Sequence, residues 1–392
     1  MSRSGLSECL FEWDSGWIER MRRSSGVDFD RSEVIAELGI ALRELNRRFT
    51  DSSDGVLDLY GQDPRLRKAY SVYYLLANLP KVVHVLLAHA VDPLRLRSML
   101  DLGTGPGTIP LGVLTFLSLS GAVAPAMDCV CVDRSRGFAD LAGCLIRSWR
   151  ESLDIRGRTR QLAVDLMDYR HPVSAPVDLL GMGNMLTEIS AGGALRKVIR
   201  LAESVVVEGG LFLMIEPATP GAARKVLAVR DELVSRNWRV EGPCPGSYAC
   251  PAMKRDGDWC HHRLSWSRPV LIGDLDRRAG FDKQFLNFTY CLLRRSPAGE
   301  LSGADAASPG RGYIVVSDLL ASKGKYEVYL CGRERKVLVK LEKKHVSASN
   351  RDLLRVQRYD RVGFEADIGR DARIELTPTS SFFRISHTME GQ

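Results

Sequence analysis

The chain has 392 residues, 45% of them hydrophobic, so it can bury a large core, and we expect two or more structural units. Its net charge of +7 at pH 7 is modest, and we expect no apolar run long enough to cross a membrane. The first residues include Glu8, Glu12 and Asp14, unlike a secretory signal or an acid-poor transit peptide, so we expect a cytoplasmic protein. In a reducing compartment, the nine cysteines are expected to bind metal or lie in the core rather than form disulfides.

Residues 1–95 are predicted to form a helical region. Ser32 is a candidate N-cap, and apolar residues then recur at helical spacing, at Val34, Ile35, Leu38, Leu42 and Leu45. A second helix is predicted from Tyr70 to Ala90. Its aromatic stripe, with Tyr73 and Tyr74, could pack over a cofactor pocket, but such a stripe is more often core, and we favour core for most of it.

From residue 96 to 296, short apolar runs alternate with helical stretches, which is typical of an α/β fold with a doubly wound parallel sheet. Two segments near its end are predicted to form an antiparallel edge pair, which would complete a seven-stranded sheet. The predicted strands are residues 98–101, 129–133, 161–165, 177–181 and 211–216, followed by the edge pair 239–242 and 287–294.

The first predicted strand runs into a glycine-rich loop, Asp101-Leu102-Gly103-Thr104-Gly105-Pro106-Gly107. Its glycines allow a tight turn and close backbone approach to a ligand at a helix N-terminus. The loop lacks the lysine of a phosphate-cradling motif and the third-glycine spacing of a dinucleotide fingerprint. The pattern that remains is the loop of S-adenosylmethionine enzymes, which predicts a class I (Rossmann-like) methyltransferase sheet. The cofactor-binding candidates in the loop are Asp101, Gly103, Thr104, Gly105 and Gly107.

Two aspartates follow later strands and are predicted to bind the same cofactor. Asp133 ends the second strand, where a carboxylate can accept hydrogen bonds from both ribose hydroxyls. The alternative, an aspartate that caps the next helix, is less favoured because the distance from the glycine loop suits one βαβ unit. Asp165 is placed to meet the adenine amino group, although a simple turn residue is nearly as good an interpretation and Asp168 competes for the role.

Candidate catalytic residues follow the fourth and fifth strands, at the carboxyl edge where ligands of open α/β sheets bind. They are Asn184 and Glu188, with Glu216 before Pro217. Glu188 could instead be an ordinary carboxylate in a first helical turn. Neither segment has the Asp/Asn-Pro-Pro-aromatic motif that binds a target nitrogen, so the sequence does not name the acceptor atom.

Three cysteines, Cys244, Cys250 and Cys260, lie within seventeen residues of the segment 243–262. Their spacing is wider than the two to four residues usual for structural zinc, which favours an iron-sulfur cluster and leaves zinc as the alternative. We choose Cys331, beside Gly332, as the fourth ligand; His261 and His262 are alternatives. Cys291 is expected mid-strand, and the remaining cysteines are expected to be small buried residues: Cys9, Cys129, Cys131 and Cys144.

Residues 297–312 are rich in Gly, Ala, Ser and Pro and predict a linker. The part that follows, residues 313–392, is predicted to be a small basic β unit with strands at 313–316, 326–330, 337–341 and 361–366. The segment from Lys323 to Lys344 contains eight basic and three acidic residues. These charges, with Tyr326, Tyr329 and Tyr359, could bind a nucleic-acid backbone and stack bases, or could form a solvated face.

Taken together, these motifs resemble the methyltransferase-like proteins that associate with the small ribosomal subunit during its assembly, a family typified by a mitochondrial member. The resemblance covers about residues 70–344. It rests on Tyr73-Tyr74 with Asn78 and Lys81, the glycine loop, Glu216-Pro217, Tyr290 with Arg294-Arg295, and above all the series Cys244-Pro245, Cys250-Pro251, Asp258-Trp259-Cys260-His261 and Leu330-Cys331.

The resemblance implies S-adenosylmethionine binding, a 4Fe-4S cluster on Cys244, Cys250, Cys260 and Cys331, and a role on small-subunit ribosomal RNA. The partner would be the small ribosomal subunit, with no membrane and a monomeric protein off the ribosome; the mitochondrial matrix is the alternative location. The chain departs from the family at Gly246, where relatives usually have histidine, and at His262, where they often have phenylalanine.

Two functional hypotheses follow. In the first, the protein is an S-adenosylmethionine-dependent RNA methyltransferase that acts mainly by positioning the acceptor beside the methyl group. In the second, it is a non-catalytic assembly factor in which cofactor and cluster stabilise a ribosome-binding shape.

Overall fold

The computed structural model describes residues 31–51, 60–122, 125–170, 175–189, 192–297, 312–366 and 372–385. Internal contacts divide the chain into two units: the first comprises Met1–Val226 and His261–Tyr290, and the second comprises Leu227–Cys260 and Cys291–Gln392. The cysteine-rich segment thus groups with the C-terminal strands rather than with the glycine loop. Except for its end residues 297 and 312, the predicted linker lies outside the described residues.

The helices that precede the sheet belong to the first unit. Helix α2 spans Ser32–Asp51 and buries Ile35, Leu38, Leu42 and Leu45, four of the five predicted apolar positions; Val34 is half-buried. Helix α3, Pro64–Tyr70, begins where Asp63 accepts hydrogen bonds from the Arg65 and Leu66 amides and proline occupies the first turn. A π-helical turn, η2 Ser71–Leu75, joins it to α4, Leu76–Ala88.

The continuous helix Pro64–Ala88 is long and apolar enough to cross a membrane by length and composition, with a mean hydropathy of 1.3 in its most apolar window. Our expectation that the chain has no apolar run of this length was therefore wrong. However, 78% of that window is buried inside the fold. The packing of α4 against α5 marks it as a core helix.

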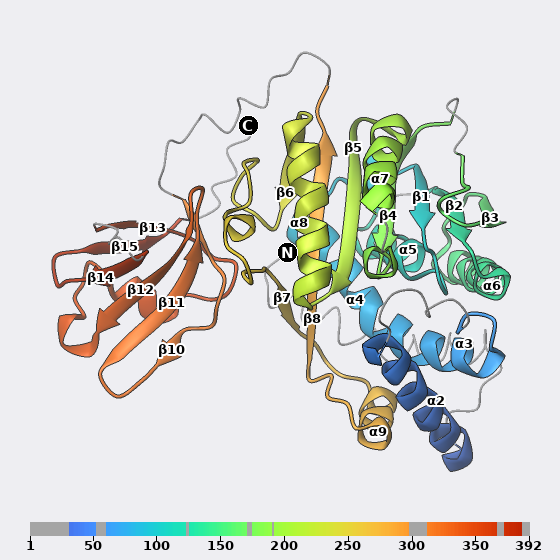
Figure 1. Ribbon diagram of the computed structural model, residues 1–392, viewed down its shortest axis with the longest axis horizontal. Coiled ribbons are helices and arrows are strands. Elements are labelled where there is room, and N and C mark those ends of the chain that lie inside the picture. The colour runs from blue at the N-terminus through green and yellow to red at the C-terminus, as the bar shows by residue number, and fades with distance from the viewer. Residues whose placement is uncertain are drawn as a thin grey trace. The chain divides into compact units, whose positions relative to one another are not determined.

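An eight-stranded sheet forms the centre of the α/β part, with the order β3-β2-β1-β4-β5-β8-β6 and β7 paired to β8 (Figure 1). Strands β1 to β5 pair with one another in parallel, and β6 and β7 each pair with β8 antiparallel. The strands are β1 Ser98–Leu102, β2 Asp128–Asp133, β3 Thr159–Ala163, β4 Val177–Gly183, β5 Val206–Pro217, β6 Trp238–Gly242, β7 His262–Ser265 and β8 Phe285–Arg295.

Connecting helices follow the parallel strands as predicted for βαβ units. They are α5 Thr108–Leu119, α6 Arg136–Leu153, α7 Gly192–Val205 and α8 Pro220–Ser235, whereas α9 Val270–Ala279 lies between the antiparallel strands β7 and β8. Short 3-10 turns are present at η3 Pro93–Arg95, η4 Leu186–Glu188 and η5 Pro251–Lys254. The parallel order and the antiparallel end strand are those of a class I methyltransferase sheet. The predicted fold class is confirmed.

Several details of the sheet differ from the sequence prediction; β5, for example, begins at Val206 rather than at residue 211. Strand β3 begins two residues earlier than expected, because Thr159 pairs with Cys129 at the start of β2, and it ends at Ala163, before Asp165. Strand β7, which holds His262, was not predicted, because its four residues show no clear apolar alternation. They pair with the N-terminal residues of β8.

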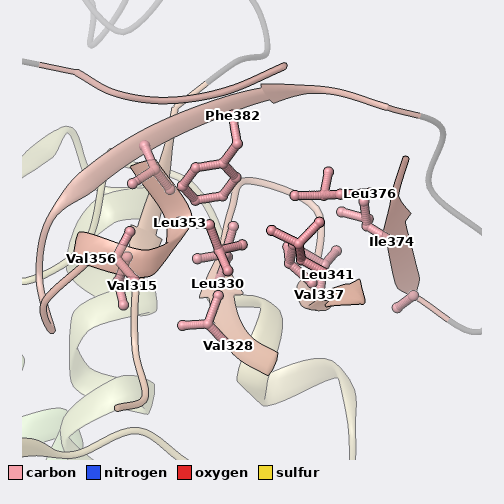
Figure 2. Close-up of a cluster of buried hydrophobic side chains, with 13 residues drawn as sticks. Val315, Val328, Leu330, Val337, Leu341, Leu353, Val356, Ile374, Leu376 and Phe382 are labelled. Carbon is pink, nitrogen blue, oxygen red and sulfur yellow. The ribbon is translucent and has the colours of Figure 1, made fainter. Parts of the chain in front are cut away.

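The second unit contains a seven-stranded sheet with the order β14-β12-β11-β9-β13-β15 and β10 paired to β11. Its buried residues, drawn in Figure 2, include Val328, Leu330, Val337, Leu341 and Phe382. The predicted strands are present as β9 Tyr313–Val315, β11 Lys325–Cys331, β12 Lys336–Glu342 and β13 Arg361–Glu365. Three were not predicted: β10 Leu320–Ala321, β14 Arg373–Leu376 and β15 Ser381–Arg384. Two 3-10 turns are η7 Lys343–His345 and η8 Arg351–Arg355.

Candidate functional site

A cavity of about 220 Å³ lies in the first unit at the carboxyl ends of β1, β2 and β4. Its walls come from the glycine loop, the turn after β2, the segment after β3, the turn after β4 and two aromatic residues, Tyr60 before α3 and Tyr70 at its end. This is the edge at which open α/β sheets bind ligands. The residues with predicted roles that line it are Gly103, Gly105, Asp133, Asp165, Asn184 and Glu188.

The glycine loop has the backbone conformation that only glycine adopts readily. Gly103, Gly105 and Gly107 have φ angles of 68°, 52° and 93°. A Cβ on Gly103 would lie 2.7 Å from the sulfur of Met185, so the loop and the turn after β4 approach too closely for any side chain. Gly107 is the N-cap of α5 and does not line the cavity; a smaller adjoining cavity of about 20 Å³ includes Thr104 in its wall.

Asp101 lies beneath the loop rather than in the cavity wall. It is 1% exposed, and burial raises the pKa of its carboxyl to about 8. The Thr104 hydroxyl donates to the Asp101 carbonyl oxygen at 3.1 Å, so these two residues hold the loop from behind. The structure therefore places Asp101 as a support of the loop, without contact to the cavity.

Asp133 connects the end of β2 to the glycine loop. One carboxylate oxygen accepts from the Gly105 amide at 2.7 Å, and the other accepts from the Ser135 amide at 2.8 Å. Burial raises the pKa of Asp133, partly offset by these two amides. The helix cap is formed instead by the Ser135 hydroxyl, which accepts from the Phe138 amide. The carboxylate lines the cavity at the position we predicted for the ribose ligand.

Asp165 lines the cavity, whereas its competitor Asp168 does not. A carboxylate oxygen of Asp165 accepts from the Met167 amide at 2.7 Å, and its carbonyl accepts from the Asp168 amide. Val164, Leu166 and Met167 lie beside it in the wall. The residue is thus both a turn former and a cavity residue, and its contact with adenine stays a prediction.

Asn184 and Glu188 line the side of the cavity next to β4. Asn184 has a φ angle of 55°, an uncommon conformation outside glycine. Burial raises the pKa of the Tyr70 hydroxyl, and the Asn184 side chain partly offsets this. Glu188 ends the short turn η4 and accepts from Arg134 at 3.2 Å and from the Tyr60 hydroxyl at 3.4 Å. Both residues thus line the cavity from the side of β4, and their predicted catalytic roles stay predictions.

Glu216 is not among the residues that line the cavity, and its predicted catalytic role stays a prediction. The residue is 0% exposed, and one carboxylate oxygen accepts from the amides of Met185 and Leu186 at 2.8 and 2.7 Å. Burial raises its pKa to about 7, against the opposing effect of backbone amides that include these two. Glu216 fixes the turn after β4 and is a positioning residue.

Aromatic residues of the cavity wall were not predicted as site residues. Tyr60, Tyr70 and Phe138 line the cavity, with ring centroids 5.5 to 5.7 Å apart. Tyr70 was interpreted as core; it is buried and also lines the cavity, so the two roles coincide. Tyr60 had no periodic signal, and Phe138 looked like an ordinary apolar position of α6.

The four predicted cysteine ligands lie together in the second unit. Burial raises the pKa of Cys250 to about 11 and that of Cys260 to about 12, and the charge of Cys244 raises both further. Burial also raises the pKa of Cys331, to which the charges of Cys244, Cys260 and Cys250 add. The thiols are therefore close enough to repel one another when ionised. Cys260 packs against the small apolar cluster of Leu227, Cys250 and Ala252.

No three His, Cys, Asp or Glu side chains in the described part of the chain stand in the arrangement of ligands around one metal ion. His262 instead places its Nε2 3.2 Å from that of His84 and contacts the rings of Phe288 and Tyr290. Of the other cysteines, Cys129, Cys131 and Cys291 are buried as expected. The prediction for Cys144 was wrong, because it lies on the exposed face of α6, and Cys9 lies outside the described residues.

Basic residues of the second unit are partly paired. Lys325, Lys340 and Lys344 form ion pairs with Glu327, Glu375 and Glu342. Others are exposed, namely Lys323, Arg333, Arg335 and Lys343, as is Tyr329. Lys343 lies 5.6 Å above the ring of Tyr326.

The sheet order and the glycine loop define the class: the protein has the class I S-adenosylmethionine-dependent methyltransferase fold. Residues 65–351 match the family model described as mitochondrial small ribosomal subunit Rsm22. Since the match covers more than half of the chain, the protein belongs to that family, and the resemblance predicted from the motifs is confirmed.

Comparison with curated proteins gives no match. Among solved structures, mitomycin 7-O-methyltransferase is 15% identical with a TM-score of 0.37; the alignment covers 61% of this chain and 60% of that chain. A Listeria monocytogenes protein named as a class I S-adenosylmethionine-dependent methyltransferase is 14% identical (TM-score 0.35; 75% and 89% covered). A Pyrococcus horikoshii protein named as an RNA methyltransferase is 11% identical (TM-score 0.33; 68% and 98% covered).

Proposed function

We propose that the protein binds S-adenosylmethionine in the cavity of the first unit and transfers its methyl group to RNA of the small ribosomal subunit during subunit assembly. The carrying observation is that six residues with predicted roles line one cavity at the carboxyl edge of a class I sheet. Family membership supports the small subunit as the partner, since the family is described by that name. The family is also described as mitochondrial, which agrees with our alternative location; a cytoplasmic location remains a prediction.

The residues suit the cofactor in chemical terms. The positive φ angles of the loop present backbone without side chains, and Asp133 offers a carboxylate whose loop contact also fixes its own position. When bound, S-adenosylmethionine would supply an electrophilic methyl group. The chain's part is then to exclude water with the aromatic wall and to hold the acceptor through Asn184 and Glu188.

The binding step has a direct test with the matched carboxylates Asp133 and Asp168. We expect Asp133→Ala to abolish S-adenosylmethionine binding measured by calorimetry and methyl transfer to small-subunit RNA, because it removes both the predicted ribose ligand and the Gly105 contact. Asp168→Ala, outside the cavity, should keep both. If the two variants bind the cofactor alike, the cavity is not the cofactor site.

We also propose that Cys244, Cys250, Cys260 and Cys331 hold a 4Fe-4S cluster. Their mutual charge repulsion and burial support one shared thiolate site. The wide spacing of Cys244, Cys250 and Cys260 in the sequence favours a cluster over one structural zinc ion. Iron, zinc and acid-labile sulfide analysis of protein purified without oxygen distinguishes the cluster from zinc, and finding neither would contradict a metal site.

A non-catalytic assembly factor is the second candidate. The favouring observation is that Glu216, the most buried carboxylate near the cavity, supports a turn instead of facing an acceptor. In this case, Asp133→Ala protein would still bind small subunits and support their maturation. The exposed basic residues and Tyr329 of the second unit are the proposed RNA contact in either case.

A further inference from the structure

Helix α8 carries a buried arginine whose role the cofactor pocket does not explain. Arg230 is 1% exposed, although arginine almost never lies inside a protein without partners. The guanidinium keeps its charge at all accessible pH values, so the surrounding protein has to compensate a permanent positive charge. It is followed by Asp231, with which it forms an ion pair.

The pair binds the loop that joins two of the proposed cluster ligands. The Arg230 guanidinium donates to the carbonyl oxygens of Tyr248 and Gly246 at 2.6 and 3.0 Å. Asp231 accepts from the Cys250 amide, at 3.1 and 3.0 Å to its two oxygens. Two successive side chains thus fix three backbone groups between Cys244 and Cys250. This is more than packing a helix against a loop requires.

These contacts involve only the two terminal nitrogens of the Arg230 guanidinium. Nε of Arg230 is buried and has no hydrogen-bond partner among the described residues, which is costly for a charged donor. Burial opposes the charge of Arg230, but the charges of Cys244, Cys291 and Asp231 raise its pKa overall, so these two cysteines lie near the guanidinium. The unused donor therefore belongs to the cysteine site.

A negatively charged cluster at the cysteine site would be stabilised by a hydrogen-bond donor such as Nε of Arg230. Four thiolates outweigh the positive charge of a 4Fe-4S core, so the bound cluster is a buried anion that needs cations or donors nearby. Lys336 is the second cation there: it donates to Asp258 and to the Trp259 carbonyl, and its charge acts on Cys260 and Cys331. The two cations thus serve different pairs of cysteines.

We propose that Arg230 is a positioning residue of the cysteine site: it holds the Cys244–Cys250 loop and donates Nε–H to a sulfur of the bound cluster, with Asp231 orienting it. This inference rests on the proposed cluster. It assigns α8 a task beyond covering the sheet, and it predicts that the stability and reduction potential of the cluster depend on one charge.

The test compares full-length wild type with Arg230→Met, Arg230→Lys and the control Arg236→Met. Arg236 follows the same helix and pairs with Glu232 at 2.6 Å on the surface. Iron and acid-labile sulfide are counted after anaerobic reconstitution, iron loss to a chelator is timed, and the reduction potential is measured. Circular dichroism of each metal-free protein checks the fold.

We expect Arg230→Met to lose iron about 10- to 100-fold faster than wild type, as for other residues that orient metal ligands. Its reduction potential should be more negative, because a cation that stabilises the reduced cluster is gone. Arg230→Lys should fall between the two, and Arg236→Met should match wild type. If Arg230→Met does not fold, the lysine variant decides, since its charge is kept and only the planar donor is lost.

Wild-type iron retention and potential in both Arg230 variants would overturn the inference while leaving the proposed cluster standing. Wild-type protein that binds no iron would instead overturn the cluster proposal and the inference with it. Wild-type protein that holds zinc without sulfide would overturn the cluster donor role of Nε.

Discussion

Replacing Glu216 by glutamine should remove a pH-dependent destabilisation of the fold. The carboxyl is fully buried, and burial raises its pKa from 4.5 to about 7. Glutamine keeps the oxygen that accepts from the Met185 and Leu186 amides and replaces the unpartnered Oε2 by an uncharged group. The variant thus imitates the protonated carboxyl at every pH.

The sign follows from the raised pKa. The folded state binds this proton more tightly than the unfolded state does. The group therefore does not lower the free energy of unfolding below pH 4.5, and it lowers that free energy increasingly as the pH rises from 4.5 through 7. The shift of about 2.5 units corresponds to about 3 kcal/mol in full, of which about 2 kcal/mol appears between about pH 5.5 and about pH 8. Asp101, with its pKa raised to about 8, contributes equally to both proteins and cancels in the difference.

The assay is urea unfolding followed by circular dichroism at a series of pH values. We expect the stability of Glu216→Gln relative to wild type to rise by about 2 kcal/mol from about pH 5.5 to about pH 8. Glu232→Gln, at a surface carboxylate paired with Arg236, serves as the control and should differ from wild type by a constant. A pH-independent difference for Glu216→Gln would refute the reasoning.

Three further predictions concern the glycine loop, the cavity and the thiolates. Gly103→Ala should weaken S-adenosylmethionine binding measured by calorimetry, because the new Cβ meets the Met185 sulfur; Gly121→Ala has the same φ but open space, so it should cost only about 1 kcal/mol of stability. Equal affinities for these two variants would show that the loop clash is irrelevant. Asp165→Asn should reduce cofactor affinity by about tenfold or less in the same titration, since only one cavity contact changes; unchanged affinity would remove Asp165 from the adenine site. Cys260→Ser should lose bound iron by colorimetric assay, and the exposed control Cys144→Ser should keep it.

The sheet could be predicted because its signals are local. Each parallel strand is a short apolar run, and the glycine loop follows the first of them directly, so the order of the strands and the position of the cavity follow from chain order. The same reasoning located Asp133, whose place at the end of β2 needs no tertiary information. Strand β7 was not predicted, because its four residues form a strand through pairing with β8 and have no apolar pattern of their own.

Residues of the candidate site were predicted only where a local sequence motif marks them. Tyr60 reaches the cavity through tertiary packing against Tyr70 and Phe138, which no spacing reveals. The contacts of Glu216 could not be predicted, because a carboxylate at a strand end can face a ligand or turn inward to bind amides, and only the backbone of the next turn decides. Arg230 was missed because a single arginine in a helix usually lies at the surface.

The most direct test of the proposed function is transfer of a radiolabelled methyl group from S-adenosylmethionine to RNA of small ribosomal subunits isolated from cells that lack the protein. The account predicts label in small-subunit RNA with wild-type protein and none with Asp133→Ala. Absence of label from wild-type protein that demonstrably binds both the cofactor and the subunit would contradict methyl transfer and establish the non-catalytic assembly factor instead.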